Sequence, residues 1–555
     1  MLLFTPTLRR AGLVVAALFT ALTAPAQTTA PAWTGASALG AGQMSSGSLA
    51  TDAAGNTYVA GSFSGTTTIG GTTLTSAGGL DGYLAKFTPT GTLAWVFPFA
   101  STGNDLAQDV ALDADGYAYV AGSFVNFISL GNSFSLTGTG TGATRAFVAR
   151  FTPQGVPQWV QQNNTTSTAS GQTIGVDANG WVYVAGQFST SVSFGAPAVG
   201  ANSGSGFGTY LAVLSAANGT VRTVTTAFDY INLPTGPTSY PTPRLAVVPA
   251  GGAYLLNTFA VSTNFGSNRI FTTRGGNDAL VAKYSGLGVL EWADQLGGSG
   301  ADQVQDGKVD AAGNLYLGGN FTGPATFGTA TLTSVGGVDG YVAKYSPQGT
   351  LLWVSSSGGP TGEGWGSISL DAAGNPYATG NFTGTAQFGA TTLTSAGATD
   401  IVVAAYSPQG QVRWVQQAGG NLSDVGFHLG FDALGQGYVL GNFSSSPCNF
   451  GPYPLSATTT PTNFMARLGA TPLTTRPTAP QPLGLYPNPA SGTVHLPALP
   501  AGTPVLVLDA RGRVAREAVV SASGQVVVRG LGPGLYTLRA TTAQGQPLAG
   551  KLVVE

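Results

Sequence analysis

Acidic side chains recur at a fixed distance behind the tryptophans of this chain. Four of them stand ten residues after a tryptophan: Asp105, Asp302, Glu363 and Asp424. In two of these segments a second acid follows four residues later, Asp109 and Asp306, and His428 takes that place in the last. Carboxylate oxygens bind hard cations and accept hydrogen bonds from sugar hydroxyls. The six acids are therefore candidate ligands for a cation or a polar glycan, and turn capping with surface solubility is the alternative role.

Other side chains give little support for catalysis. The chain has two histidines, His428 and His495, and one cysteine, Cys448. A catalytic triad, a zinc cluster or a Cys–His pair would need more convergent groups than these. We therefore assign no catalytic residue, no metal centre and no cofactor, with a weakly held divalent cation at the acids as the one exception. A lyase or hydrolase that uses a lone acid is the alternative to a non-enzymatic protein.

The composition sets further bounds. Of 555 residues only 8% are charged, and the formal net charge is −2. No basic excess is present to follow a phosphate backbone, which argues against nucleic acid as a partner. Glycine reaches 83 residues, and together with Thr and Ser it predicts many tight turns between short strands.

One twelve-residue phrase, "DAAGNTYVAGSF" at Asp52, recurs along the chain. Its seven copies start at residues 52, 113, 177, 248, 310, 371 and 432, and Val248 replaces the aspartate in the fourth. A tyrosine stands six residues after every start. Asp followed by Ala-x-Gly predicts a turn in which the carboxylate accepts backbone N–H bonds and Gly takes a positive φ. The aspartates therefore have a structural role, and the tyrosines a place in the core, with ligand stacking as the alternative for the tyrosines.

Each copy predicts four strands, which in the first copies read "VALDADG", "YVAGSF", "GYLAKFTPTG" and "TLAWV". No helical periodicity is sustained beyond the N-terminal apolar stretch, so the sequence predicts an all-β fold. Val, Ala, Gly and Tyr occupy both alternating faces, as a sheet covered on both sides requires. Seven four-stranded units around a ring predict a seven-bladed β-propeller over residues 27–470.

The two ends of this array complement each other. The seventh copy stops after "FMARLGATPL" without a tryptophan strand, while Trp33 stands alone 19 residues before Asp52. The strand around Trp33 should fill the outer place of the last blade, beside residues 463–468. That pairing would close the ring and leave no free sheet edge.

The repeats resemble the SBBP family, named for seven-bladed β-propeller repeats. The resemblance is carried by "GNTYVAGSF", "GNLYLGGNF", "DGYLAKFTPTGTLAWV" and "DGYVAKYSPQGTLLWV". It covers residues 33 to about 468 and implies the fold, but no reaction. Copies three and four depart most from the pattern, through Val248 and an insertion near residues 226–243.

Both ends of the chain carry targeting features. Two arginines precede an apolar stretch that is shorter than the roughly 20 residues of a membrane span, and no later segment is a predicted transmembrane segment. Small residues Ala24 and Ala26 fit a signal-peptidase site, so residues 1–26 are a predicted secretory signal. A Pro- and Thr-rich linker follows the repeats at residues 471–483. Residues 484–555 then alternate apolar strands with Gly turns, which predicts a small β-sandwich.

This tail resembles the type A C-terminal sorting domain of the type IX secretion system. The matching residues are Tyr486, Pro487, Asn488 and Pro489, residues 509–513, Gly534, Tyr536 and Lys551. The resemblance implies the type IX machinery as a partner, with attachment to surface lipopolysaccharide or release after export. A fibronectin-like accessory module is the alternative.

The sequence thus predicts a secreted protein on the outer surface of a Gram-negative bacterium. Its propeller would act as a binding or structural scaffold for a glycan or protein ligand. The alternative is a secreted propeller enzyme, a lyase or hydrolase acting on a polysaccharide.

Overall fold

The computed structural model describes residues 29–131, 134–138, 142–195, 197–201, 206–231, 242–260, 262–265, 269–457, 461–469, 481–497, 499–509, 514–541 and 547–555. The predicted signal segment 1–26, with Ala24 and Ala26, lies outside these residues, as do residues 471–480 of the linker and residues 510–513 of the tail. The chain divides into two units, Met1–Gly469 and Ala470–Glu555. Every regular element of the described residues is a β-strand, so the all-β prediction is confirmed.

Within these described ranges there is no helix of the length and apolar character needed to cross a membrane.

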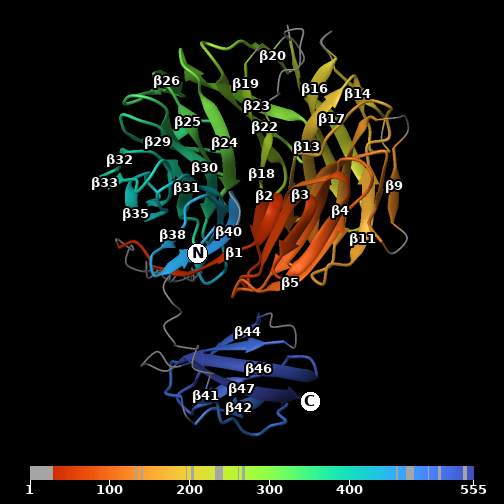
Figure 1. The fold of residues 1–555 in the computed structure, drawn as a ribbon. Helices are drawn as coiled ribbons and strands as arrows, with labels where there is room; N and C mark the ends of the chain where they lie inside the picture. Colours follow the sequence, from red (N-terminus) through yellow and green to blue (C-terminus); the bar gives the residue numbers. More distant parts are fainter. Residues whose placement is uncertain are drawn as a thin grey trace, which may run out of the picture. The chain divides into compact units, whose positions relative to one another are not determined.

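Seven antiparallel sheets of the larger unit, numbered here in chain order, share one four-strand meander (Figure 1). Sheet 1 comprises β2 (Gly40–Thr51), β3 (Thr57–Ile69), β4 (Thr72–Phe87) and β5 (Leu93–Phe99). Sheet 2 comprises β6 (Leu106–Leu112), β7 (Ala118–Val125), β10 (Thr144–Phe151) and β11 (Pro157–Gln162). Sheet 3 comprises β12 (Thr173–Val176), β13 (Trp181–Ser189), β16 (Phe207–Ser215) and β17 (Val221–Tyr230).

The remaining sheets repeat this order. Sheet 4 comprises β18 (Arg244–Val247), β19 (Ala253–Phe259), β22 (Asp278–Tyr284) and β23 (Leu290–Gly298). Sheet 5 comprises β24 (Gln303–Val309), β25 (Leu315–Phe321), β28 (Asp339–Tyr345) and β29 (Leu351–Gly358). Sheet 6 comprises β30 (Glu363–Leu370), β31 (Pro376–Phe382), β34 (Asp400–Tyr406) and β35 (Val412–Ala418). Sheet 7 comprises β36 (Asp424–Phe431), β37 (Gly437–Phe443), β40 (Thr462–Leu468) and β1 (Trp33–Ala38).

The first strand of every sheet faces one central axis. The strands β2, β6, β12, β18, β24, β30 and β36 all contribute residues to a single axial cavity. Figure 1 shows the sheets arranged in a ring, so the fourth strand of each sheet is the outermost. Four-stranded sheets placed radially around an axis in this way form a β-propeller.

The turn between the first and second strands explains the recurring aspartates. In sheet 1 the Asp52 carboxylate accepts the backbone N–H of Ala54 at 3.0 Å and of Asn56 at 2.8 Å, and Gly55 has a φ of 84°. The same two bonds recur at the other copies that have the aspartate: Asp113, Asp177, Asp310, Asp371 and Asp432. The predicted turn role is confirmed.

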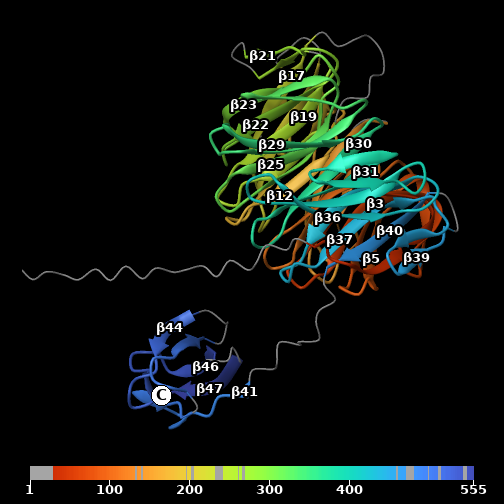
Figure 2. The ribbon, with the colours of Figure 1, turned by 90° about the vertical axis from the view of Figure 1, so that its left-hand side faces the viewer.

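The strand at the N-terminal end of the array completes sheet 7. β1 pairs antiparallel with β40, from Trp33 opposite Leu468 to Ala38 opposite Phe464. Trp33 is only 2% exposed and packs edge-on against Phe450 at a ring distance of 5.2 Å. The predicted pairing of this strand with residues 463–468 is confirmed, and Figure 2 shows β37 and β40 beside strands of sheet 1.

Trp33 nevertheless does not stand at the repeated tryptophan position. In sheet 1 that position is Trp95, which lies opposite Lys86. Gly35 lies opposite the corresponding Arg467, and Trp33 takes the place of Leu93, before the register shift that both outer strands share. The indole therefore fills space against the neighbouring hairpin.

A hairpin between the second and third strands reaches back to the preceding sheet. In sheet 5 this hairpin is β26 (Pro324–Phe327) with β27 (Ala330–Thr333), and it pairs with the outer strand β23 of sheet 4. The hairpins β20 (Thr263–Asn264) with β21 (Ile270–Phe271), and β32 (Thr385–Phe388) with β33 (Thr391–Thr394), extend β17 and β29 in the same way. These pairings cover outer edges that would otherwise be free.

The remaining hairpins are held by single bridges or short pairings. They are β8 (Phe127–Ser129) with β9 (Ser135–Thr137), β14 (Ser191–Val192) with β15 (Val199–Gly200), and β38 (Cys448–Phe450) with β39 (Tyr453–Leu455). A β-bridge joins Ser129 to Ala100, and another joins Asn449 to Gly419. Ala100 and Gly419 each directly follow the outer strand of the preceding sheet in the chain. Cys448 is fully buried in this setting.

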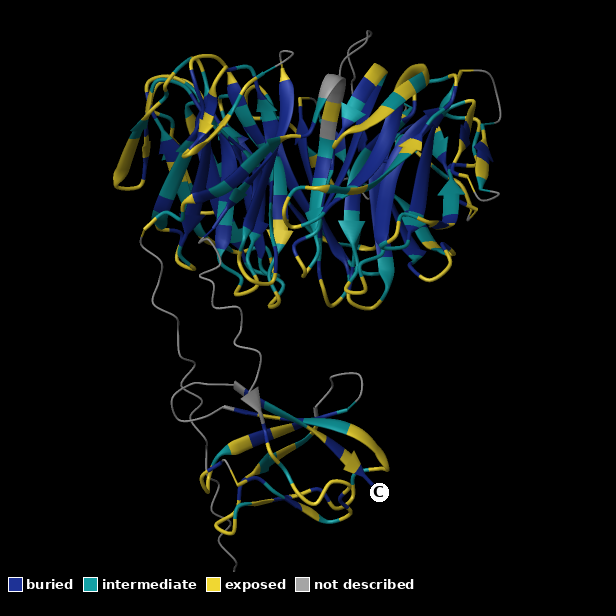
Figure 3. Ribbon diagram, turned by 60° about the horizontal axis from the view of Figure 1, so that its bottom comes forward, coloured by how far each residue is buried: buried dark blue, intermediate teal, exposed yellow. Residues whose placement is uncertain are grey.

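The core lies between neighbouring sheets. The second and third strands are buried almost throughout, and the turns are exposed, as Figure 3 shows. The repeat tyrosines that are at most 2% exposed are Tyr58, Tyr119, Tyr183, Tyr254, Tyr316 and Tyr438. Small residues permit this packing: a Cβ added to Gly61 would lie 2.1 Å from the Ser45 carbonyl oxygen. Both faces of each sheet are therefore covered, as the sequence pattern predicts.

The smaller unit has its own sheets and core. The strands β41 (Gln481–Pro482), β47 (Pro547–Val554), β46 (Gly534–Thr541), β43 (Pro504–Leu508) and β44 (Val514–Val519) form one sheet in that order. The strands β42 (Thr493–His495) and β45 (Gln525–Val527) form a second. Val494, Val507, Val526 and Leu538 are fully buried between them.

Candidate functional site

Polar side chains form a ring around the propeller axis. Five inner strands carry a β-bulge, and the residue that follows it lines the axial cavity: Ser48, Asp109, Asp306, Ser367 and His428. Thr173 of β12 lines the same cavity. Bulges re-aim a side chain at the point where an extra residue enters the strand. We call these six residues the axial ring.

Asp109 ties three sheets together. One carboxylate oxygen accepts the Ser48 hydroxyl of sheet 1 at 2.5 Å and the Val110 N–H at 2.9 Å. The other accepts the Thr173 hydroxyl at 3.0 Å and the Ile174 N–H at 2.8 Å, both from sheet 3. Burial raises the pKa of Asp109, and the bond from Ser48 opposes that rise.

Asp306 plays the same part on the other side of the ring. One oxygen accepts the Gly307 N–H at 2.7 Å and pairs with the Lys308 ammonium at 3.2 Å. The other accepts the Ser367 hydroxyl at 2.8 Å and the Ile368 N–H at 3.1 Å from sheet 6. Burial opposes ionisation, but Lys308 and these donors together outweigh it, so the pKa of Asp306 is lowered.

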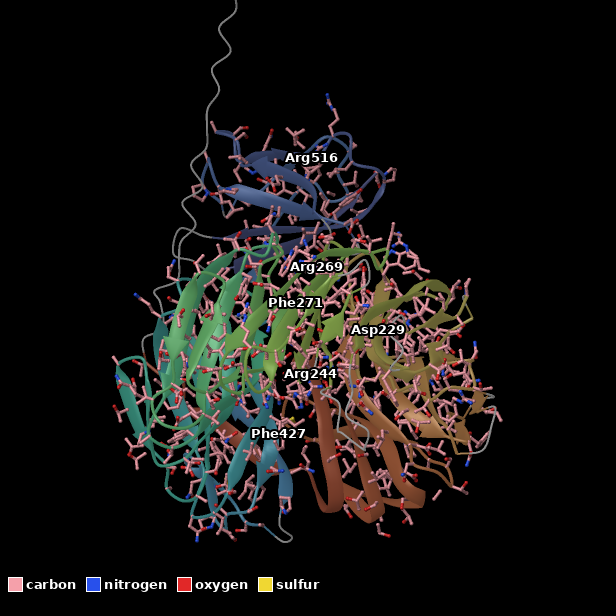
Figure 4. All side chains as sticks on the ribbon, turned by 90° about the horizontal axis from the view of Figure 1, so that it is seen from above. Asp229, Arg244, Arg269, Phe271, Phe427 and Arg516 are labelled. Carbon is pink, nitrogen blue, oxygen red and sulfur yellow. The ribbon has the colours of Figure 1, made fainter. Side chains whose placement is uncertain are left out.

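The cavity inside the ring has a volume of about 370 Å³ and is charged on several sides. Arg244 at the start of β18 lines it and donates its Nε–H to the Gln305 carbonyl at 3.2 Å. Figure 4 places Arg244 toward the middle of the larger unit, with Arg269 farther out. Burial and the nearby Arg244 charge lower the pKa of His428 to about 4, so this imidazole is neutral at pH 7.

The structure separates the six acids that the tryptophan spacing singled out. Asp109 and Asp306 lie on the axial ring, together with His428. The other four lie where one sheet meets the next, buried to within 3% of full burial: Asp105, Asp302, Glu363 and Asp424. These four are not surface loop residues that promote solubility, because their carboxylates face the protein interior. Turn capping does occur, since the Gly298 N–H bonds Asp302 at 2.7 Å.

Burial dominates the ionisation of these junction acids. It raises the pKa of Asp105 and of Asp302 to about 6, and that of Glu363 to about 7. Backbone N–H bonds oppose the rise in each case. A second carboxylate near each acid adds to the rise: Asp81, Asp278 and Asp339, respectively.

Sequence reasoning missed most of the polar residues that line the cavity. Ser48, Thr173, Ser367, Arg244 and Lys308 line the cavity but carried no chemical motif. A signal was present, because Ser367 stands 61 residues after Asp306, as His428 does after Ser367 and Asp109 after Ser48, which is the commonest repeat interval. Comparing equivalent positions across the copies would have found the ring.

The sorting-motif residues have defined places in the smaller unit. Tyr486 stacks on His495 at 5.1 Å, and Pro487 and Pro489 flank Asn488. The Asn488 side chain donates to the Lys551 carbonyl at 2.9 Å and accepts the Val553 N–H at 2.8 Å, so it fastens the motif to the last strand. Gly534 begins β46, and the Tyr536 hydroxyl donates to the Gly532 carbonyl at 2.9 Å.

The chain therefore combines a β-propeller that has a polar axial cavity with a compact β-tail. Residues 484–555 match the family described as the Secretion system C-terminal sorting domain. The tail is a sorting domain of the type IX system, which implies secretion and makes the export machinery a partner. No curated protein matches the chain.

A comparison with solved structures finds several distant similarities. The quinohemoprotein alcohol dehydrogenase from Comamonas testosteroni is 10% identical over 79% of this chain and 76% of its own, with a TM-score of 0.36. BamB from Moraxella catarrhalis is 12% identical over 71% and 92%, with a TM-score of 0.32. A protein of unknown function from Dyadobacter fermentans is 10% identical over 79% and 98%, with a TM-score of 0.33. At these scores the fold assignment rests on the strand pairing of this chain itself.

Proposed function

We propose that this protein is exported by the type IX system and displayed on the outer cell surface of a Gram-negative bacterium. There a seven-bladed propeller of SBBP-type repeats acts as a binding scaffold whose axial cavity takes a polar glycan. The N-terminal secretory signal would carry the chain across the inner membrane, and the sorting tail across the outer one. Anchoring to surface lipopolysaccharide would follow from the same tail.

The polarity of the axial cavity is the observation that carries the ligand proposal. Its wall offers hydroxyl, carboxylate, guanidinium, ammonium and imidazole groups within about 370 Å³. Among the described residues no carboxylate forms a salt bridge with Arg244, so its guanidinium can donate hydrogen bonds to a ligand. A hydroxyl-rich ligand can exchange hydrogen bonds with such a wall, whereas an apolar ligand would leave buried polar groups unpaired.

The same geometry favours binding over catalysis. Both oxygens of Asp109 and both oxygens of Asp306 are already occupied by donors from neighbouring sheets. A general acid or base in a glycosidase or lyase must instead exchange a proton with the substrate. The two axial acids therefore hold neighbouring sheets together. A lyase or hydrolase is the weaker of the two proposed functions.

A glycan array probed with the full secreted chain tests the proposal. Binding should appear to a restricted set of polar glycans and weaken at least tenfold in Arg244→Gln. The matched control is Arg413→Gln on the outer strand β35, which should bind as the wild type does. Surface display with no glycan bound would remove the ligand and leave a structural scaffold. Release of reducing ends from a bound polysaccharide would favour the enzyme instead.

A further inference from the structure

Each buried junction acid has a partner acid 24 residues earlier in the chain. The pairs are Asp81 with Asp105, Asp278 with Asp302, Asp339 with Glu363, and Asp400 with Asp424. The first acid lies on the third strand of its sheet, within β4 for Asp81 and at the first residue of the strand in the other three pairs. The second acid lies at the start of the inner strand of the next sheet. None of the eight is more than 3% exposed. We call them the junction pairs.

The first acid of every junction pair has one oxygen without a partner. Its Oδ2 accepts the backbone N–H of the residue four positions earlier, at 2.7 Å for Asp81 and Asp278 and at 2.9 Å for Asp339 and Asp400. The Oδ1 atom is buried and has no hydrogen-bond partner in all four residues. Buried carboxylate oxygens are rarely left so, because the desolvation cost is then unpaid.

In three of the four junctions a glycine lies directly against the first acid, and Ala100 takes this place in the sheet 1–2 junction. A Cβ added to Gly297 would lie 2.6 Å from Asp278 Oδ1 and 2.8 Å from Asp302 Oδ2, so both acids border the same small space. At the equivalent positions, Gly358 and Gly419 lie against the first acids Asp339 and Asp400. Two carboxylates that border one space in the interior repel each other unless a positive charge or a proton lies between them.

The junction between sheets 2 and 3 shows which charge fits. Here Arg145 stands where the other sheets have the first acid, opposite Phe124 as Asp278 is opposite Phe259. Ala169 replaces the second acid. The Arg145 guanidinium, 1% exposed, donates to the backbone carbonyls of Thr165 and of Ser167, the latter at 2.9 Å. Carbonyl oxygens of this loop therefore accept a cation at the junction.

We propose that the junction pairs bind divalent cations, Ca²⁺ by their oxygen chemistry, in the place that the Arg145 guanidinium takes between sheets 2 and 3. Ca²⁺ takes six to eight oxygen ligands, including carboxylates and backbone carbonyls. Among the described residues no three His, Cys, Asp or Glu side chains cluster as a metal site. The ion would therefore rely on two carboxylates, with carbonyl oxygens of the loop and water completing its shell.

The four pairs are not equal. Both oxygens of Asp424 are occupied, by the N–H groups of Gly420, Ser444 and Ser445 and by the Ser445 hydroxyl. The second acids of the other three pairs accept fewer bonds. We therefore assign one ion to each of the pairs led by Asp81, Asp278 and Asp339, and none to the pair of Asp400 and Asp424.

Terbium, a luminescent substitute for Ca²⁺, provides the test on the full secreted chain after EDTA treatment. Trp365 is 2% exposed, and its Nε1 lies 2.8 Å from a Cβ added to Gly340, next to Asp339. Excitation of tryptophan at pH 7.5 should give saturable Tb³⁺ emission that Ca²⁺ displaces. Asp339→Asn with Glu363→Gln should remove most of it. Asp371→Asn, which removes one carboxylate from a turn, should leave it intact.

A double substitution distinguishes a bound cation from a proton that the two acids share. Asp278→Arg with Asp302→Ala copies the sheet 2–3 junction into the sheet 4–5 junction. It should lower the number of Ca²⁺ bound by one, measured by equilibrium dialysis, and make the melting temperature less sensitive to EDTA. Asp278→Asn alone should also lower the number by one if the double variant fails to fold. A wild-type protein that binds no Tb³⁺ or Ca²⁺ at pH 7.5 would overturn the proposal, and the pairs would then share protons.

Discussion

The indole N–H of Trp33 donates a hydrogen bond of 3.0 Å to the carbonyl oxygen of Gln417, 384 residues later in the chain. The two residues belong to different sheets, since Trp33 lies on the outer strand of sheet 7 and Gln417 on that of sheet 6. Together with the pairing of β1 and β40, this bond fastens the N-terminal strand to two sheets at once.

Removal of this indole should weaken the whole propeller. Trp33→Ala should lower the free energy of unfolding by about 3–5 kcal/mol, as loss of a large buried aromatic does. Chemical denaturation followed by fluorescence measures the change. Trp181→Ala is the control, because Trp181 is half-buried at the start of β13 and its removal should cost less. Equal losses of unfolding free energy in the two variants would show that closing the ring with β1 adds no special stability.

A second set of indoles links neighbouring sheets. The Trp159 Nε1–H donates to the Ala216 carbonyl at 2.9 Å in a buried setting. Trp159→Phe keeps an aromatic ring but leaves this carbonyl without its donor, so we expect a loss of about 1 kcal/mol. Trp353→Phe breaks the same bond to Pro408 at an exposed position and should cost less. A melting curve of each variant decides between them.

The neutral His428 should make the propeller less stable in acid. Its pKa is lowered to about 4 in the folded chain, below the ordinary value of 6.5 for a histidine. Between these values the unfolded chain binds more protons than the folded one, so stability falls as the pH falls from 6.5 toward 4. His428→Gln should therefore lose less stability than the wild type between pH 7 and pH 5. An identical pH profile for both proteins would contradict the assignment.

The sorting tail should decide location and not propeller folding. Deletion of residues 484–555 should leave a folded propeller in the periplasm, detected by fractionation and protease resistance. Asn488→Ala should reduce export more mildly, because it removes two bonds to β47. Lys551→Ala, at an exposed side chain, is a milder comparison. Normal surface display of the deleted chain would exclude the export role.

Local chemistry made much of the fold predictable. The aspartate turns depend only on a carboxylate and a glycine within five residues, so Asp52 and Gly55 could be read directly. The place of β1 followed from a missing fourth strand. Its register did not, because Trp33 invites alignment with the repeated tryptophans, whereas it pairs two residues before that position, in the place of Leu93.

The candidate site was less predictable because a bulge divides it. Strand alternation would place Asp105 and Asp109 on one face, since they are four residues apart. The bulge between Ala107 and Asp109 adds a residue, so one acid faces the sheet junction and the other the axis. The partner acid Asp81 comes from the third strand of another sheet, and only the folded ring brings it near Asp105.

Sheet 7 has a consequence for synthesis and quality control. Its outer strand, residues 33–38, is made first, yet the strand it needs, residues 462–468, comes last in the propeller. Until then the growing chain has an unpaired edge, the kind of surface that aggregates or is degraded. The sorting tail begins only after β40, so every chain that carries this tail also carries the strand that closes the ring. Because of this order of segments, a chain whose propeller is unfinished also lacks the sorting tail.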